Sequence, residues 1–293
     1  MQERRYGMWQ GRKVLFIGDS LTAKRIYPEV VKDILGIETF YHAKGGASLK
    51  SMVDGDNGMG GEYDNETDAA GVLRPLTAKD VEGMDLIVFY GGYNNRNLDI
   101  GQVGDLYRVD GTGQKTIAGF MQYAINRIYE ELYAADNMTC RLLVVTVDCA
   151  GRYPYVDANA YEETPKGSGR TLEAMAKMQK AVAARNSIPC CDLFTTSGIN
   201  EHTWNYFGAS PVADNDKFTK YLLDEHGNRV SDEPMRYVTG EKYYQVRDGE
   251  VVLEEYTLRP PLPYVGDQLH KSPAGYQRIG EVIAGAIIAA YGN

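Results

Sequence analysis

The sequence lacks the features that mark several large classes of protein. No apolar run is long enough to span a bilayer, and residues 283–291, although apolar, are short and rich in small side chains. Acidic residues outnumber basic ones by 40 to 31 and no basic stripe is present, so we expect binding neither to nucleic acid nor to an anionic membrane. Residues 1–12 show no secretory leader. The sequence leaves two locations possible: secretion or the periplasm, with a signal peptide already removed, or the cytoplasm. It does not indicate the oligomeric state.

Cysteine is also scarce, and the four cysteines do not have the spacing of metal ligands. They lie in or beside apolar segments, at positions 140, 149, 190 and 191. We predict buried free thiols, because the adjacent pair cannot easily bridge to itself. Histidines and carboxylates show no ligand spacing either, so no metal or organic cofactor is expected. Tyrosine is abundant, with 22 residues against 7 Phe and 2 Trp, which suits recognition by loops.

Short apolar segments alternate with segments of helical periodicity over the first two thirds of the chain. Strands are predicted at 14–17 (with Lys13 leading in), 38–42, 84–90, 141–147 and 188–193. Helices are predicted at 22–35, 116–135, 171–186 and in a closing segment that Ser272-Pro273 opens. The alternation implies right-handed crossovers and a parallel sheet covered on both faces.

The alternation stops between residues 200 and 266, where the sequence is polar and aromatic. Within this stretch, 243–246 and 251–256 flank a turn sequence and predict a β-hairpin. We therefore predict a single domain over 1–293, with 200–266 as an insertion or cap that folds over the site. A second stretch at 53–70 is rich in Gly, Asp and Asn, which predicts a solvated loop of unassigned role.

Residues with catalytic potential follow the predicted strands. Ser20 comes after the first strand, Gly46 after the second and Asn94 after the third. The carboxyl ends of parallel strands meet at one sheet edge, so we expect these residues to lie close together. Asp267 and His270 precede the closing helix at a spacing that lets the carboxylate orient the imidazole.

Together these residues supply what acyl transfer from an ester requires. Ser20 is the predicted nucleophile, His270 the base and then the acid, and Asp267 the residue that orients His270. The N–H groups of Ser20 and Gly46 and the side-chain amide of Asn94 are the predicted oxyanion hole. Each pattern alone has a plainer interpretation: Ser20 as a helix cap, and Asp-x-x-His as a surface pair.

The chain resembles the SGNH hydrolases, also called the GDSL esterase/lipase family. The resemblance rests on four blocks, which are Gly18-Asp19-Ser20-Leu21, Gly46, Gly92-Tyr93-Asn94 and Asp267-Gln268-Leu269-His270. It implies a three-layer α/β/α sandwich with a flavodoxin-like parallel sheet of about five strands. It also implies a flat, accessible site and ester hydrolysis by a Ser-His-Asp triad. The resemblance covers the whole chain in outline. Individual residues match the family only within these four blocks.

Two departures from the family pattern concern loops beside the site. Asn95 stands where the third block commonly continues with Asp, and Ala43 or Lys44 stands where the second block often begins with Asn. They put loop support and substrate contacts in question rather than the type of reaction.

Substrate contacts are predicted at Asp19, Tyr93, Asn95, Arg96 and Trp204. Arg96 would pair with an acidic group, with loop bracing as its alternative, and Trp204 would stack on a sugar ring. The aromatic loops and the absence of a long apolar strip favour removal of O-acetyl groups from carbohydrate.

The alternatives are a lipase or lysophospholipase on the same triad, and a non-catalytic carbohydrate-binding module with a retained fold. A nucleotide-binding protein is disfavoured, because the first turn lacks a Gly-rich phosphate cradle. Of the other histidines, His42 is predicted to be structural and His226 a solvated turn residue, while His202 is a lesser candidate for substrate contact.

Overall fold

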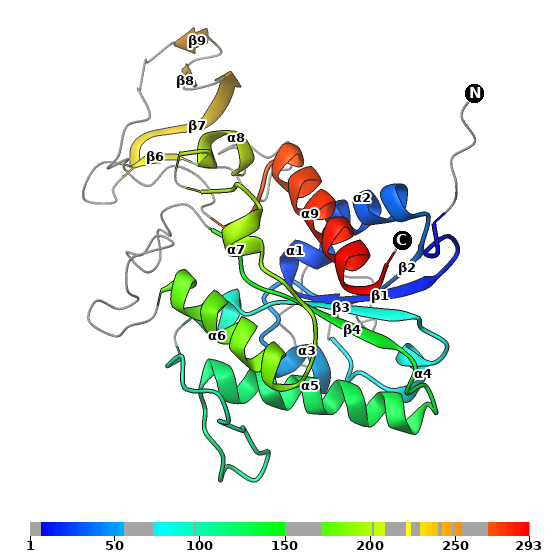
Figure 1. The fold of residues 1–293 in the computed structure, drawn as a ribbon. Coiled ribbons are helices and arrows are strands. Elements are labelled where there is room, and N and C mark those ends of the chain that lie inside the picture. The colour runs from blue at the N-terminus through cyan, green and yellow to red at the C-terminus, as the bar shows by residue number, and fades with distance from the viewer. Residues whose placement is uncertain are drawn as a thin grey trace, which may run out of the picture.

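A central sheet of five parallel strands organises the chain (Figure 1). The computed structural model describes residues 7–55, 73–96, 98–149, 171–200, 202–208, 221–223, 229–239, 242–247, 250–252 and 269–292. The sheet order is β2-β1-β3-β4-β5, formed by β1 (Lys13–Gly18), β2 (Glu38–Ala43), β3 (Leu86–Tyr90), β4 (Arg141–Val145) and β5 (Cys190–Cys191). This confirms the predicted parallel sheet of about five strands.

Helices cover both faces of this sheet, which is why its strands are apolar almost throughout. On one face α2 (Ile26–Leu35) packs against α9 (Pro273–Tyr291), and on the other α5 (Ile117–Ala134) packs against α6 (Leu172–Arg185) (Figure 1). Every residue of β3 is buried, as are five of the six in β1. Strands enclosed in this way need apolar side chains on both sides.

Shorter helices connect these layers. They are α1 (Ser20–Ala23), α3 (Ser51–Asp54), α4 (Ala78–Val81), α7 (Leu193–Thr196), α8 (Trp204–Phe207) and the 3₁₀ turn η1 (Tyr93–Asn95). α1 and η1 directly follow β1 and β3, at the carboxyl edge of the sheet. This edge is where open parallel sheets carry their ligand sites.

The long helices begin where the sequence supplies capping side chains. The hydroxyls of Thr116, Thr171 and Ser272 each accept a hydrogen bond from a backbone N–H in the first turn, at 3.0, 3.0 and 3.2 Å. Pro273 follows Ser272 at the first helical position, where a missing N–H costs nothing. The closing helix therefore starts where the sequence predicts.

Four predicted elements differ in extent from the structure, two of them only because the strands predicted at 84–90 and 141–147 are each two residues shorter. The helix predicted at 22–35 is broken after α1, because Arg25 adopts a left-handed backbone conformation (φ 58°) and α2 begins after it. The strand predicted at 188–193 is shorter, with only Cys190 and Cys191 paired to β4. Asp192 then accepts a hydrogen bond from the Thr195 N–H and caps α7, so the chain leaves the sheet.

The four cysteines are free thiols, as predicted. Three are buried, and Cys190 is half-buried. Burial raises the pKa of Cys140, Cys190 and Cys191 to about 12, which keeps these thiols protonated and unreactive near neutral pH.

A second, antiparallel sheet lies within the predicted insertion. Its order is β6-β7-β8-β9, formed by β6 (Tyr221–Leu223), β7 (Arg229–Thr239), β8 (Lys242–Arg247) and β9 (Glu250–Val252). Val246 in β8 stands opposite Val251 in β9. The predicted turn at 248–249, the strand end at 253–256 and most of the 53–70 loop lie outside the described residues. The hairpin as a whole and the division into domain and insertion stay predictions.

Candidate active site

Ser20 lies at the first residue of α1, immediately after the turn that ends β1. The cap of this helix is Asp19, whose Oδ1 accepts a hydrogen bond from the Leu21 N–H at 3.0 Å. Asp19, and not the Ser20 hydroxyl, therefore caps this helix. Its side chain is half-buried, whereas the residues on either side of it are buried.

The Ser20 hydroxyl meets the imidazole of His270. Oγ of Ser20 and Nε2 of His270 lie 2.7 Å apart, a normal hydrogen-bond distance. His270 is half-buried and precedes the cap of α9, between Leu269 and Lys271, which are both buried. A serine hydroxyl bonded to an imidazole is the arrangement that activates an oxygen nucleophile.

The orienting carboxylate predicted at Asp267 lies outside the described residues, as does Gln268. Its contact with the second nitrogen of His270 stays a prediction. The described structure begins again at Leu269.

Two of the three residues predicted to bind the oxyanion, Gly46 and Asn94, come from chain segments that contact each other. Nδ2 of Asn94 donates a hydrogen bond to the Ala47 carbonyl at 3.0 Å, which places Asn94 beside the turn that contains Gly46. An amide nitrogen carries two hydrogens, so one donor of Asn94 stays available. Within the described ranges the backbone N–H groups of Ser20 and Gly46 have no acceptor. Gly46 has φ of +80°, a conformation that favours glycine.

Three of the residues predicted to contact substrate are buried in the structure. Asp19, Tyr93 and Asn95 are 1%, 2% and 5% exposed. Oδ1 of Asn95 accepts a hydrogen bond from the Leu49 N–H at 2.9 Å, which braces the loop. Little of these three side chains is accessible to a ligand in this structure, and their contact with substrate stays a prediction. The guanidinium of Arg96, which is half-buried, donates to the Tyr93 carbonyl at 3.3 Å.

The cap predicted to cover the site begins close to His270. Gly208 pairs with Lys271 through a backbone bridge, and the Ser272 N–H donates to the Phe207 carbonyl at 2.8 Å. α8, which contains Trp204, is thereby held beside the start of α9. The side chain of Trp204 lies outside the described part, and so does His226.

His42 is 1% exposed, which agrees with the structural role predicted for it.

Burial governs the electrostatics behind Ser20. It raises the pKa of Asp19 to about 7, with the Asp148 carboxylate adding to the increase. The Leu21 N–H and the Lys271 ammonium act in the opposite direction. Burial, followed by the charge of Asp148, raises the pKa values of Tyr90 and Tyr93 well above the ordinary range, so both hydroxyls keep their protons.

Sequence reasoning missed three residues of this region: Tyr90, Asp148 and Lys271. Asp148 follows β4 at the same sheet edge as Ser20 and Asn94, and is fully buried. A carboxylate after a fourth strand and a lysine directly after His270 were visible in the sequence. Their burial was the missing information, because it is decided by segments far away in the chain.

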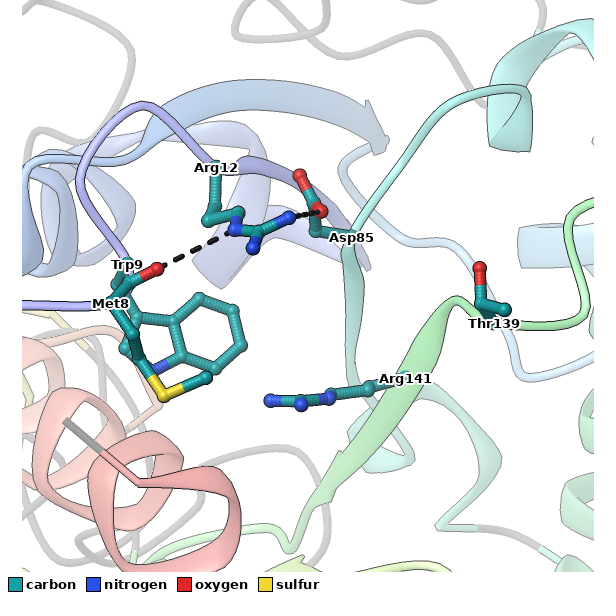
Figure 2. Close-up of a pocket in the computed structure, with 6 residues that line it drawn as sticks. All are labelled: Met8, Trp9, Arg12, Asp85, Thr139 and Arg141. Atoms are coloured by element: carbon teal, nitrogen blue, oxygen red, sulfur yellow. Dashed lines mark hydrogen bonds and ion pairs between the residues drawn. The ribbon is translucent and has the colours of Figure 1, made fainter.

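A cavity of about 160 Å³ lies at the opposite edge of the sheet (Figure 2). Arg12 and Asp85, which line it, form an ion pair at 2.7 Å beside the amino ends of β1 and β3. The guanidinium of Arg141 lies 5.6 Å from the ring centre of Trp9. The cavity is therefore remote from Ser20, which follows the carboxyl end of β1.

The described residues contain no cluster of three or more His, Cys, Asp or Glu side chains that could hold a metal ion. None of their helices is long and apolar enough to cross a membrane.

Comparison with known proteins shows the fold. No protein-family model and no curated protein matches the sequence. The chain is similar to a possible lipase from Chitinophaga pinensis at 15% identity and a TM-score of 0.54, over 96% of this chain and 99% of that one. A protein from Slackia heliotrinireducens provisionally named an SGNH hydrolase matches at 15% identity and a TM-score of 0.47, over 95% and 100%. A GDSL-like lipase from Bacteroides thetaiotaomicron matches at 14% and 0.39, over 95% and 89%.

Proposed function

We propose that this chain is a serine hydrolase of the SGNH type, which cleaves carboxylic esters through an acyl-enzyme on Ser20. The observation that carries the proposal is the 2.7 Å contact between Ser20 Oγ and His270 Nε2 at the carboxyl edge of a parallel sheet. The four sequence blocks support it. So does a fold that matches a possible lipase along almost its whole length.

The first half of the reaction forms the acyl-enzyme. His270 Nε2 takes the hydroxyl proton as Ser20 Oγ attacks the ester carbonyl carbon. The carbonyl oxygen gains negative charge and is met by the N–H groups of Ser20 and Gly46 and by the second N–H of Asn94. His270 then gives its proton to the departing alcohol as the bond between carbonyl carbon and alcohol oxygen breaks.

The second half regenerates the enzyme. A water molecule loses a proton to His270 and attacks the acyl carbon. The bond to Ser20 breaks, the carboxylic acid is released, and the proton returns from His270 to Ser20 Oγ. Asp267 accepts the Nδ1–H of His270 throughout, which holds the tautomer that leaves Nε2 free to act.

For the substrate we propose an O-acetylated carbohydrate. The segment beside His270 is aromatic: α8 carries Trp204 and Tyr206, and the Tyr206 side chain is 67% exposed. Exposed aromatic rings with a polar edge suit binding to sugars. A lipase-type activity is the second candidate, favoured by the name of the Chitinophaga pinensis protein.

Two measurements test the proposal. A fluorophosphonate probe should label the wild-type chain covalently and fail to label Ser20→Ala. Wild-type protein should release acetate from acetylated polysaccharides and hydrolyse p-nitrophenyl acetate faster than p-nitrophenyl palmitate. The reverse preference would establish the lipase-type activity. Absence of both labelling and hydrolysis would overturn the enzymatic proposal and favour a binding module.

A further inference from the structure

Asp148 is the centre of a buried polar cluster behind the site. The Tyr90 hydroxyl donates to its Oδ1 at 3.0 Å, and the hydroxyl of Tyr93 contacts the same oxygen. The Tyr93 hydroxyl also accepts a hydrogen bond from the Asp148 N–H at 2.7 Å. Since Tyr93 immediately precedes Asn94, these bonds attach the Asn94 turn to the loop that follows β4.

Lys271 brings a positive charge into this cluster. Its Nζ lies 3.1 Å from Asp148 Oδ2, an ion-pair distance without hydrogen-bond geometry, and both side chains are 0% exposed. The same ammonium donates to the Leu269 carbonyl at 2.7 Å and lies 5.9 Å from the ring centre of Tyr93. The side chain of Lys271 thus folds back toward Leu269, and the segment 269–271 is linked to Asp148 in the loop that follows β4.

Asp19 completes the set, which we call the Asp148 cluster: Asp19, Tyr90, Tyr93, Asp148 and Lys271. Asp19 is buried and interacts electrostatically with both Asp148 and Lys271. The residue before Ser20, the residue before Asn94 and the residue after His270 therefore interact in one place. The three chain segments that carry the proposed chemistry share one buried polar support.

A buried ion pair is poor evidence for stability. Removing two charges from water has a large free-energy cost, and an apolar pair of equal size is often as stable. The segments that the pair connects are more informative. Lys271 and Asp148 link the backbone beside His270 to the loop that follows β4 and, through Asp148, to the two tyrosines. The Lys271–Asp148 pair therefore restricts the positions that the segment around His270 can adopt.

We propose that Lys271, through Asp148, is a positioning residue that holds the imidazole of His270 against the Ser20 hydroxyl. This inference rests on the proposed function. Lys271 does not touch the reacting atoms, and its effect passes through the backbone on either side of His270.

The test compares Lys271→Met with the double variant Lys271→Met/Asp148→Asn. The single variant leaves the Asp148 carboxylate buried without its cation, so both stability and kcat should fall. The double variant removes both charges and keeps an acceptor for the two tyrosines, so most of the unfolding free energy should return. If the pair positions His270, kcat stays roughly 10²-fold below wild type with KM within about twofold. Recovery of kcat together with stability would overturn the proposal.

A milder variant covers the case in which Lys271→Met fails to fold. Tyr90→Phe removes one 3.0 Å hydrogen bond to Asp148 and leaves both charges in place. We expect kcat to fall several-fold at unchanged KM. An unchanged kcat in a folded Tyr90→Phe protein would count against a positioning role for the cluster.

A structural measurement separates failure of this inference from failure of the proposed function. Crystal structures of the wild-type and double-variant proteins should show the Ser20–His270 contact intact in the first and lengthened or lost in the second. If wild-type protein neither hydrolyses esters nor reacts with the phosphonate, the proposed function fails, and the distance still tests whether Lys271 positions His270. An unchanged distance in the double variant overturns the inference.

Discussion

Ser20 Oγ and His270 Nε2 lie 2.7 Å apart although 250 positions separate the two residues. Ser20 stands between β1 and the rest of α1, and His270 stands just before α9. α2, which follows α1 closely, packs along α9 on one face of the sheet. The packing of the first helices against the last brings the proposed nucleophile to its proposed base.

Replacing His270 by Ala should reduce kcat by roughly 10⁴-fold or more, because Ser20 loses the group that takes its proton. His202→Ala is the matched comparison: His202 is exposed and a lesser candidate for substrate contact, so its loss can raise KM but should leave kcat close to wild type. Steady-state hydrolysis of p-nitrophenyl acetate checks both variants. Equal losses would show that the assignment of His270 as the base is wrong.

Two adjacent asparagines should behave differently when changed to Ala. Asn94→Ala removes a proposed oxyanion donor and should lower kcat by roughly 10²–10³-fold. Asn95→Ala leaves the buried Leu49 N–H without its acceptor and should cost about 1–3 kcal/mol of unfolding free energy, with little loss of kcat in folded protein. Kinetics and urea denaturation distinguish the two. An Asn94→Ala protein with normal kcat would remove Asn94 from the oxyanion hole.

Asp19 should make the protein less stable as the pH rises. Its pKa is about 7 in the native state against a reference value of 3.8, so between about pH 4 and 7 the native state holds a proton that the unfolded state has lost. The free energy of unfolding contributed by Asp19 is therefore present below pH 4 and is lost as the pH rises through 7. Asp19→Asn should abolish this decline. Urea denaturation from about pH 4 to 8 measures it, and a decline that persists unchanged contradicts the assignment.

His42 should have the opposite effect. Burial lowers its pKa to about 4 from 6.5, with a smaller opposing effect of Asp80, so between pH 4 and 6.5 only the unfolded state takes up the proton. Stability from His42 is therefore present above pH 6.5 and is lost as the pH falls through 4. His42→Gln should remove this loss on the acid side. The same denaturation series tests it, since His42→Gln and Asp19→Asn must change the pH slope with opposite signs.

Gly18 should not tolerate a side chain. A Cβ at this position would lie 2.0 Å from Thr22 Oγ1 and 2.6 Å from the Tyr90 carbonyl, and the carbonyl belongs to β3 and cannot move away. Gly18→Ala should cost roughly 1–3 kcal/mol of stability and lower kcat, because the turn before Ser20 must shift. Gly285→Ala in α9 is the control. No atom lies within 4 Å of its added Cβ, so it should be neutral or more stable by roughly 0.5–1 kcal/mol.

The elements that could be predicted are those whose signals are local. Apolar runs at β1 and β3 predicted strands because a strand enclosed by helices must be apolar on both sides. Thr116, Thr171 and Ser272 marked helix starts because capping uses only neighbouring residues. The same local logic failed after Ala23 and at Leu193, where backbone turns end elements that periodicity alone would continue.

The sequence by itself determined the order of strands and helices, the placing of Ser20, Gly46 and Asn94 after successive strands, and the grouping of His270 with the start of the last helix. Only the tertiary structure decided that Ser20 touches His270, and that Asp19 is buried directly before Ser20. It also decided that Asp148 and Lys271 form a buried pair beside them. The physical reason is that backbone propensity and capping act between neighbours along the chain. Burial, and with it the state of a charge, is set by residues that meet only when the sheet and its helices have packed.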